Sequence, residues 1–319
     1  MLRSIKGLRF YIYCVMGLLV MSLGLAACGE TNIAPVQSNP GPVSRAAATG
    51  TITGVSPVIV PANKSTSGEV IVFAASSLTG PFNEMKANLE KANPNLKITI
   101  NYGASNTLRT QLEQGAKADL FAPANQVEMD NARKAGLVAD QGKTFVRNRL
   151  VLILPEGNPG KVTRLQDLAK PGLKFVMAQK DVPVGGYTLT ALDKMSKDAT
   201  YGSDFSNRVQ ANVVSREANV KQVVSKVQLG EADAGIVYFS DTTPGTGSSI
   251  SSIDIPDQFN TIASYPIAPL KSGHNQAGAK LFQDYVLGTE GQAILKNNNF
   301  IPVAVATSSQ GETGRSIRV

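Results

Sequence analysis

Histidine, cysteine and tryptophan are nearly missing from this sequence of 319 residues, and their scarcity limits its chemistry. There is one histidine, His274, there are two cysteines, Cys14 and Cys28, and there is no tryptophan. One imidazole and two thiols cannot build a Cys- and His-rich zinc or iron site, so we expect no metal held directly by the protein. A Ser-His-Asp hydrolase would have only His274 as its base. Because G-x-S-x-G, Ser-x-x-Lys and P-loop patterns are also missing, we expect no enzyme and no cofactor.

Charged residues are sparse as well, at 17% of the chain, against 42% hydrophobic residues. This balance provides a sizeable core and excludes wholesale disorder. The formal net charge is +7, but residues 69–302 hold 24 Lys and Arg side chains against 22 Asp and Glu. Such a small and scattered excess is not typical of a nucleic-acid-binding surface, so we expect no nucleic-acid partner.

The N-terminus has the pattern of a secretory signal peptide. Arg3, Lys6 and Arg9 precede an apolar run over residues 10–27. The run ends in Leu-Ala-Ala-Cys, which resembles the bacterial lipobox, with Cys28 as the acylated residue. We therefore predict a lipoprotein signal peptide over residues 1–27 and an extracytoplasmic protein anchored to the cell membrane by lipid on Cys28. The alternative is an uncleaved signal anchor, since about 20 apolar residues span a bilayer.

Two segments have the composition of connecting chain. Residues 28–68 mix Pro, Gly, Ser, Thr, Ala and Asn, have no helical period, and predict a flexible tether. Residues 304–319 predict a disordered tail.

Between these segments, strand-like and helix-like patterns alternate. Buried strands are expected at residues 69–74, 96–102, 118–122, 150–154, 174–178, 209–214 and 234–238. Helices are expected at residues 81–92, 107–114, 125–135, 165–169, 186–195, 219–229 and 275–287. This alternation predicts an α/β protein with parallel sheets, and ligand sites at the carboxyl ends of the strands.

Small hydroxyl residues and glycines gather at four strand-to-helix turns, at residues 74–78, 103–107, 182–187 and 215–220. A helix N-terminus presents unpaired N–H groups and a partial positive charge, which attract anions. Serine and asparagine are also the preferred N-caps, so each turn alone has a purely structural explanation. Four such turns together favour an anion site.

Five motifs resemble those of the molybdate-binding lipoproteins and periplasmic proteins of ABC importers. In chain order they are VFAASSLT (72–79), GASNTL (103–108), GAKADLF (115–121), VPVGGY (182–187) and GEADAGIVY (230–238). The resemblance spans residues 69–302. It implies a monomer that captures molybdate or tungstate and delivers it to the permease subunits of an importer.

The same resemblance implies a type II periplasmic-binding-protein fold, with two α/β lobes around a ligand cleft. Lobe one is expected to comprise residues 69–149 and 264–303, and lobe two residues 150–263. The crossing segments are expected near Arg149 and Ser264.

The ligand residues of the family map onto five positions. In lobe one, Ser77 and Ser105 would each offer a hydroxyl and a backbone N–H. In lobe two, Val184 and Val220 would offer backbone N–H groups and Tyr238 its hydroxyl. The first turn reads Ala-Ser-Ser-Leu where the family often has Ala-Ala-Ser-Leu, so Ser76 is a further candidate.

This donor set suits a tetrahedral dianion that carries no proton, such as molybdate or tungstate. Phosphate retains a proton part of the time and needs an acceptor, for which Asp181 and Glu217 near the loops are candidates. Sulfate or phosphate binding therefore stays open as an alternative, as does a surface hydrolase that pairs a serine with His274.

Overall fold

The computed structural model describes residues 66–243 and 250–303. The predicted signal peptide, Cys28, most of the predicted tether and the predicted tail lie outside the described residues. Among the residues described, no helix is both long and apolar enough to cross a membrane.

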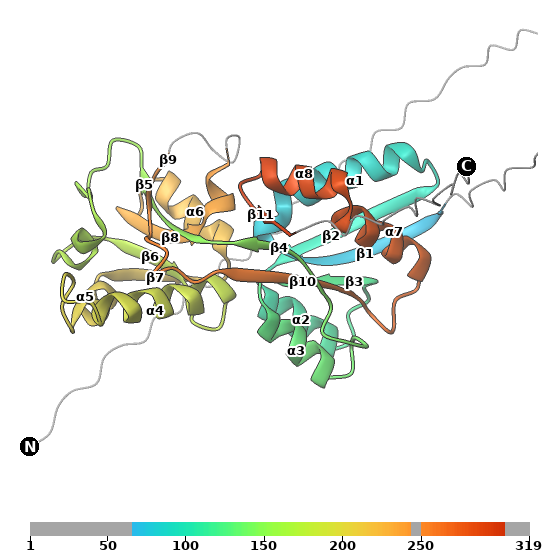
Figure 1. The fold of residues 1–319 in the computed structure, drawn as a ribbon, viewed down its shortest axis with the longest axis horizontal. Coiled ribbons are helices and arrows are strands. Elements are labelled where there is room, and N and C mark those ends of the chain that lie inside the picture. Colours follow the sequence, from blue (N-terminus) through green and yellow to red (C-terminus); the bar gives the residue numbers. More distant parts are fainter. Residues whose placement is uncertain (1–65, 244–249, 304–319) are drawn as a thin grey trace, which may run out of the picture. The chain divides into compact units, whose positions relative to one another are not determined.

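The first sheet has six strands in the order β11-β4-β10-β3-β1-β2 (Figure 1). The strands are β1 (Gly68–Ala75), β2 (Leu96–Gly103), β3 (Leu120–Ala122), β4 (Lys143–Asn148), β10 (Ala263–Pro269) and β11 (Ile301–Pro302). The helices of this lobe are α1 (Thr79–Ala92), α2 (Ser105–Glu113), α3 (Gln126–Lys134), α7 (Gln276–Leu287) and α8 (Thr289–Asn297). Strand β1 is apolar throughout its second half because both faces are covered: Val70 and Val72 belong to one apolar cluster and Phe73 to the other.

The second sheet has five strands in the order β7-β6-β8-β5-β9. They are β5 (Leu150–Pro155), β6 (Phe175–Ala178), β7 (Val213–Glu217), β8 (Ala234–Tyr238) and β9 (Ile250–Asp254). The helices of this lobe are α4 (Pro183–Ser196), α5 (Phe205–Ala211) and α6 (Val220–Gln228). Short 3₁₀ helices occur at η1 (Ser76–Leu78), η2 (Leu165–Ala169) and η3 (Phe239–Thr242).

The chain passes from one sheet to the other at Arg149, between β4 and β5. The Arg149 carbonyl accepts a 2.8 Å hydrogen bond from the N–H of Phe239. The guanidinium carbon of Arg149 lies 4.3 Å from the centroid of the Phe239 ring. The buried Asn148 donates from Nδ2 to Ser240 Oγ over 2.8 Å. These contacts tie the crossing to the segment that follows β8.

Two sequence-based expectations about the fold were wrong. The sheets are mixed rather than parallel, because β4, β5, β9 and β10 pair antiparallel with their neighbours. The strand expected over residues 209–214 is divided, with Val209 in α5 and β7 beginning at Val213. Val209 packs into the core from the same short helix as Phe205, a spacing of four residues that suits a helix.

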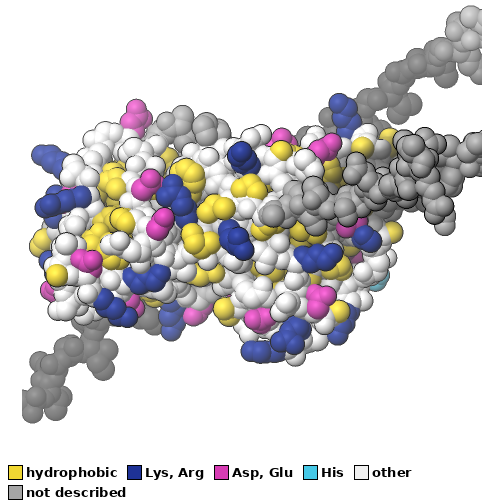
Figure 2. Space-filling view, viewed as in Figure 1, with side chains coloured by type: hydrophobic (Ala, Val, Ile, Leu, Met, Phe, Trp, Pro, Cys, Tyr) yellow, Lys and Arg dark blue, Asp and Glu magenta, His cyan; other side chains and the backbone are white. Residues whose placement is uncertain are grey.

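Figure 2 shows that acidic and basic side chains are interspersed on the face it presents. Both signs occur over both lobes.

Candidate functional site

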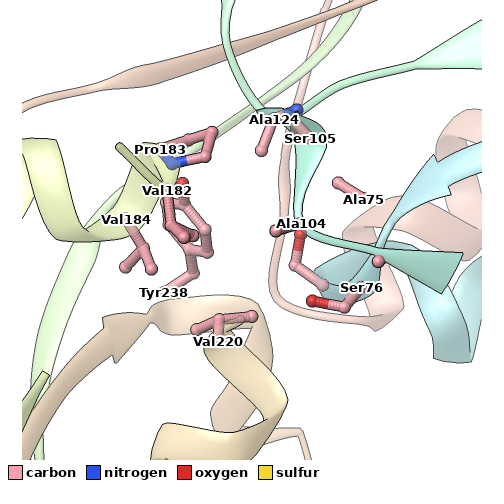
Figure 3. A pocket seen from close by; sticks show the side chains of 12 residues that line it. Ala75, Ser76, Ala104, Ser105, Ala124, Val182, Pro183, Val184, Val220 and Tyr238 are labelled. Atoms are coloured by element: carbon pink, nitrogen blue, oxygen red, sulfur yellow. Dashed lines mark hydrogen bonds between the residues drawn. The ribbon is translucent and has the colours of Figure 1, made fainter. Parts of the chain in front are cut away.

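One cavity brings together all six residues that the sequence analysis named. It is lined by residues of both lobes, among them Ser76, Ser77, Ser105, Val184, Val220 and Tyr238. Figure 3 shows Ser76 and Ser105 on the side of lobe one, facing Val184, Val220 and Tyr238 on the side of lobe two. The fold therefore brings to one cavity segments that lie far apart in the sequence, from the first turn at Ser76 to the end of β8 at Tyr238.

Four helical N-termini meet at this cavity. The helical segment that begins at Ser76 and the helix α2 approach from lobe one, while α4 and α6 approach from lobe two. Unpaired N–H groups in the first turn of each give the cavity a positive potential. Among the described residues that line it, none carries a charged side chain. The site is thus suited to an anion without using a positively charged side chain.

Gly185 allows the start of α4 to come this close. A Cβ at this position would lie 2.0 Å from the carbonyl oxygen of Gln179 and 2.7 Å from that of Ala178. Any side chain would push the first turn of α4 away from the end of β6. Gly185 of the VPVGGY motif therefore allows the Val184 N–H to take its position.

Ser105 is held as a hydrogen-bond donor. It is only 1% exposed, and its Oγ accepts a 2.9 Å hydrogen bond from the backbone N–H of Ala124. Because an N–H can only donate, the Ser105 hydroxyl proton remains free for a ligand.

The two adjacent serines of the first turn have different surroundings. Ser77 Oγ lies 3.0 Å from the hydroxyl of Tyr265, within hydrogen-bond distance. In Figure 3 the hydroxyl of Ser76 points across the cavity towards Val220. Both serines are buried. A serine hydroxyl that faces the cavity therefore needs a hydrogen-bond partner within it.

Tyr238 ends β8 and is 2% exposed. By distance and angle, its hydroxyl has no hydrogen-bond partner among the described residues. Burial raises the pKa of Tyr238 well above its ordinary value, and the nearby Tyr265 acts in the same direction. Tyr238 is therefore a neutral donor, and a buried phenol without a partner marks the place where a ligand oxygen would fit.

The cavity is small. About 10 Å³ is open to the centre of a water-sized sphere, close to the room that one water molecule needs. In this conformation the site excludes a large organic substrate.

The other candidate groups lie elsewhere. Asp181 lines a wider neighbouring groove, and Glu217 contacts Ser215 and Lys226. Neither carboxylate lines the cavity, so neither provides the acceptor that a protonated phosphate would require.

His274 is exposed and precedes α7. The neighbouring Asn275 bonds the carbonyls of Ser67 and Glu69 at the start of β1, whereas the serines follow the end of this eight-residue strand. The strand separates them by roughly 26 Å. The structure does not bring His274 and the serines together. Within residues 66–243 and 250–303, no group of three or more His, Cys, Asp or Glu side chains could hold a metal ion.

Tyr265 and Ala124 are the contacts of the site serines that sequence reasoning missed. Tyr265 lies in β10, outside the five motifs, and Ala124 lies in the loop after β3. Neither position carries a pattern that distinguishes it from an ordinary core or loop residue.

Four tyrosines, of which Tyr238 and Tyr265 are buried and Tyr102 and Tyr187 half-buried, predict a loss of stability at alkaline pH. Burial raises the pKa of Tyr187 to about 12 and raises that of Tyr102, Tyr238 and Tyr265 as well. Above about pH 10 the unfolded chain releases these protons while the folded protein retains them, so the free energy of unfolding should fall as pH rises from about 10 to 12. Urea unfolding at several pH values measures this, and Tyr187→Phe should reduce the slope. A free energy of unfolding that is constant between about pH 10 and 12 would contradict the raised pKa values of these tyrosines.

Comparison with known proteins gives consistent results. Residues 70–300 match the family model of the bacterial extracellular solute-binding proteins. The molybdate-binding protein ModA of Mycobacterium tuberculosis is 33% identical over 87% of this chain and 92% of its own length. YvgL of Bacillus subtilis is named as an ABC transporter substrate-binding lipoprotein. It is 30% identical over 72% of this chain and 85% of its own length.

Solved structures agree with the fold. A substrate-binding domain from Clostridium difficile has a TM-score of 0.55 at 30% identity and covers 74% of this chain and 99% of its own. The periplasmic molybdate-binding protein of Azotobacter vinelandii has a TM-score of 0.64 at 20% identity, covering 74% of this chain and 100% of its own. The sulfate-binding protein SubI of Mycobacterium tuberculosis has a TM-score of 0.66 at 17% identity, and the match covers 74% of this chain and 87% of SubI. The last two show the fold alone, and they confirm the predicted bilobal periplasmic-binding-protein architecture.

The match to the family model covers nearly all of the described residues. The chain therefore belongs to the bacterial extracellular solute-binding proteins and, among them, to the family of the molybdate-binding proteins ModA.

Proposed function

We propose that this protein captures molybdate, or tungstate, outside the cytoplasm and delivers it to the permease subunits of an ABC importer. Membership of a solute-binding family makes it a transport component rather than an enzyme, as the sequence predicted. The observation that carries the proposal is the chemistry of the cavity: it is lined by the N-termini of four helical segments and by the hydroxyls of Ser76, Ser77, Ser105 and Tyr238, without a charged side chain among the lining residues.

The proposed contacts divide by lobe. Ser77 and Ser105 donate from lobe one, with Ser76 as a further candidate in the first turn. From lobe two come Tyr238 through its hydroxyl and Val184 and Val220 through their backbone N–H groups. Each donor can satisfy an oxygen of a tetrahedral dianion, and the dianion in turn supplies the partner that the Tyr238 hydroxyl lacks.

The same donors argue against phosphate. A phosphate that keeps a proton needs an acceptor in the site, and Asp181 and Glu217 are outside the cavity. Sulfate is also a dianion without a proton, so donor chemistry alone does not exclude it. The discrimination between sulfate and the larger molybdate must then come from the size of the closed cavity.

Calorimetric titration of the purified protein with molybdate, tungstate, sulfate and phosphate tests the proposal. We expect saturable one-to-one binding of molybdate and tungstate, with weaker binding of sulfate and phosphate. Tighter binding of sulfate or phosphate than of molybdate would make the protein a carrier of that anion instead. A lack of binding to all four would refute oxyanion transport.

We further propose a monomer whose lobes are residues 69–149 plus 264–303 and residues 150–263. The support for the first boundary is that Arg149 lies between strands of different sheets. On this basis a ligand that contacts both lobes favours their closed arrangement.

A lipid anchor at Cys28 is the proposed means of localisation, and it would hold the protein on the outer side of the cell membrane. Cys28→Ala should abolish acylation and move the protein from the membrane fraction to the soluble fraction, because multiple acyl chains are needed for stable attachment. Fractionation with mass spectrometry of the mature N-terminus measures both effects. Cys14→Ala, in the predicted signal peptide, is the matched control and should leave acylation unchanged. A Cys28→Ala protein that stays membrane-bound after signal processing would contradict the anchor.

A further inference from the structure

Tyr265 is a fully buried tyrosine beside Ser77, one of the residues that line the cavity. It lies in β10, and its ring makes edge contacts with Phe145, Tyr238 and Phe300, with centroid distances of 6.4, 5.8 and 5.7 Å. Packing on three sides fixes the ring. The hydroxyl is thereby held 3.0 Å from Ser77 Oγ.

The proton of this hydrogen bond can belong to either oxygen, and the neighbouring Asn148 helps to decide which. Asn148 is fully buried, and its Oδ1 accepts a 3.0 Å hydrogen bond from the N–H of Arg149. Its Nδ2 therefore carries the two protons, of which one goes to Ser240 Oγ over 2.8 Å.

The same side chain is also close enough to Tyr265 to act on the pKa of its hydroxyl. Burial is the largest effect and raises the pKa of Tyr265, while the hydrogen bonds with Ser77 and Asn148 act in the lowering direction. Which of the two oxygens donates in the Ser77–Tyr265 pair follows instead from what Ser77 must offer a dianion. An Asn148 amide that donates to the Tyr265 oxygen leaves the Tyr265 proton free to go to Ser77.

We propose that Tyr265 is a positioning residue that donates its hydroxyl proton to Ser77 and so holds the Ser77 hydroxyl as a donor to the bound oxyanion. The resulting chain runs from Asn148 to Tyr265, to Ser77 and then to the ligand. This inference rests on the proposed oxyanion function and extends it to selectivity.

The direction of the chain matters because Ser77 has one proton. If Ser77 donated to Tyr265, it would turn only lone pairs towards a dianion, which is repulsive. With Tyr265 as the donor, one lone pair of Ser77 is occupied and its proton faces the cavity. If the ligand oxygen at Ser77 bears its own proton, that proton faces the proton of the Ser77 hydroxyl. Only one of these two hydroxyl groups can then donate to the other, and the second remains without an acceptor in a buried site. Tyr265 thus favours fully deprotonated oxyanions.

Tyr265→Phe tests the inference because it keeps the ring and removes the hydroxyl. Molybdate affinity, measured by calorimetry, should fall by about 3- to 10-fold, the range of one neutral hydrogen bond. Phosphate affinity, measured by competition at millimolar concentration, should stay the same or rise, since Ser77 becomes free to accept the phosphate proton. The ratio of molybdate affinity to phosphate affinity should therefore fall by at least the factor by which molybdate affinity falls.

A double-mutant cycle separates positioning from a general structural effect. In a Ser77→Ala background, Tyr265→Phe should cause no further change in molybdate affinity, because Tyr265 acts through Ser77. Tyr285→Phe is the matched control: it removes a hydroxyl that bonds Asn88 on α1, away from the cavity, and should leave affinity and selectivity unchanged. An undiminished effect of Tyr265→Phe in the Ser77→Ala background would overturn the inference. So would wild-type affinity in Tyr265→Phe, or an equal change for molybdate and phosphate.

The wild-type protein provides a second measurement that needs no substitution. In a neutron structure of the molybdate complex, the deuterium of Tyr265 should lie on the line to Ser77 Oγ, and that of Ser77 should point to the ligand. A Ser77 deuterium directed at Tyr265 would overturn the inference. Failure of the wild type to bind molybdate at all would instead refute the proposed function, so the two failures are distinguishable.

Discussion

Val220→Pro is expected to weaken molybdate binding by about 10- to 150-fold while leaving the fold intact, because it removes a single backbone donor. Val220 is the first residue of α6, where proline is favoured and where no intrahelical hydrogen bond uses the N–H. The preceding Asn219 has φ −158° and ψ 169°, an extended conformation of the kind that a residue before proline adopts. Proline therefore fits the backbone and deletes only the N–H that faces the cavity.

Val220→Ala is the matched control for this substitution. It keeps the N–H but removes buried methyl groups, since Val220 is only 3% exposed. We expect a lower melting temperature with an affinity within about threefold of the wild type, because burial affects stability and the donor affects binding. Calorimetry and thermal unfolding of both variants measure the contrast. If the proline variant binds as the wild type does, or if the alanine variant loses as much affinity, the Val220 N–H is not a ligand contact.

The strands buried on both faces could be predicted from sequence, and the strands formed by long-range pairing could not. Strand β1 has a continuous apolar run because helices cover both of its faces. Strand β4 reads Lys-Thr-Phe-Val-Arg-Asn, and only Phe145, Val146 and Asn148 are buried in it. It exists because β10 and β11 pair with it, from more than 100 residues away. Its own composition carries too little signal.

The residues that line the candidate site could be predicted from the strand-to-helix turns and from the motif resemblance, and the hydrogen bonds among them could not. Strand-to-helix turns are local features, so Ser77, Ser105, Val184 and Val220 could be named from their motifs. The Ser77–Tyr265 hydrogen bond joins residues 188 positions apart. Nothing local in β10 indicates that its tyrosine faces the first turn. The same limitation applies to Ala124, which determines where the Ser105 proton points.

Ser105→Ala and Tyr238→Phe are each expected to weaken molybdate binding by about 10- to 150-fold, the range for a hydrogen bond to a charged group. Their effects on the unliganded protein should differ in sign. Ser105→Ala leaves the Ala124 N–H without its 2.9 Å acceptor, so the melting temperature should fall. Tyr238→Phe removes a buried hydroxyl that has no partner among the described residues, so the melting temperature should stay the same or rise. Calorimetry and thermal unfolding without ligand measure both quantities.

Val184→Ala and Ser76→Ala complete the comparison. Val184 is proposed to contribute only its N–H, which alanine retains, so its affinity should change little. Ser76→Ala tests whether the second serine of the first turn shares the ligand with Ser77, and a loss comparable to that of Ser105→Ala would show that it does. The pattern across the set is decisive, because a general weakening of the cleft would affect all four variants alike. If Val184→Ala costs as much as Ser105→Ala, or if Tyr238→Phe binds molybdate as the wild type does, the proposed donor set is incorrect.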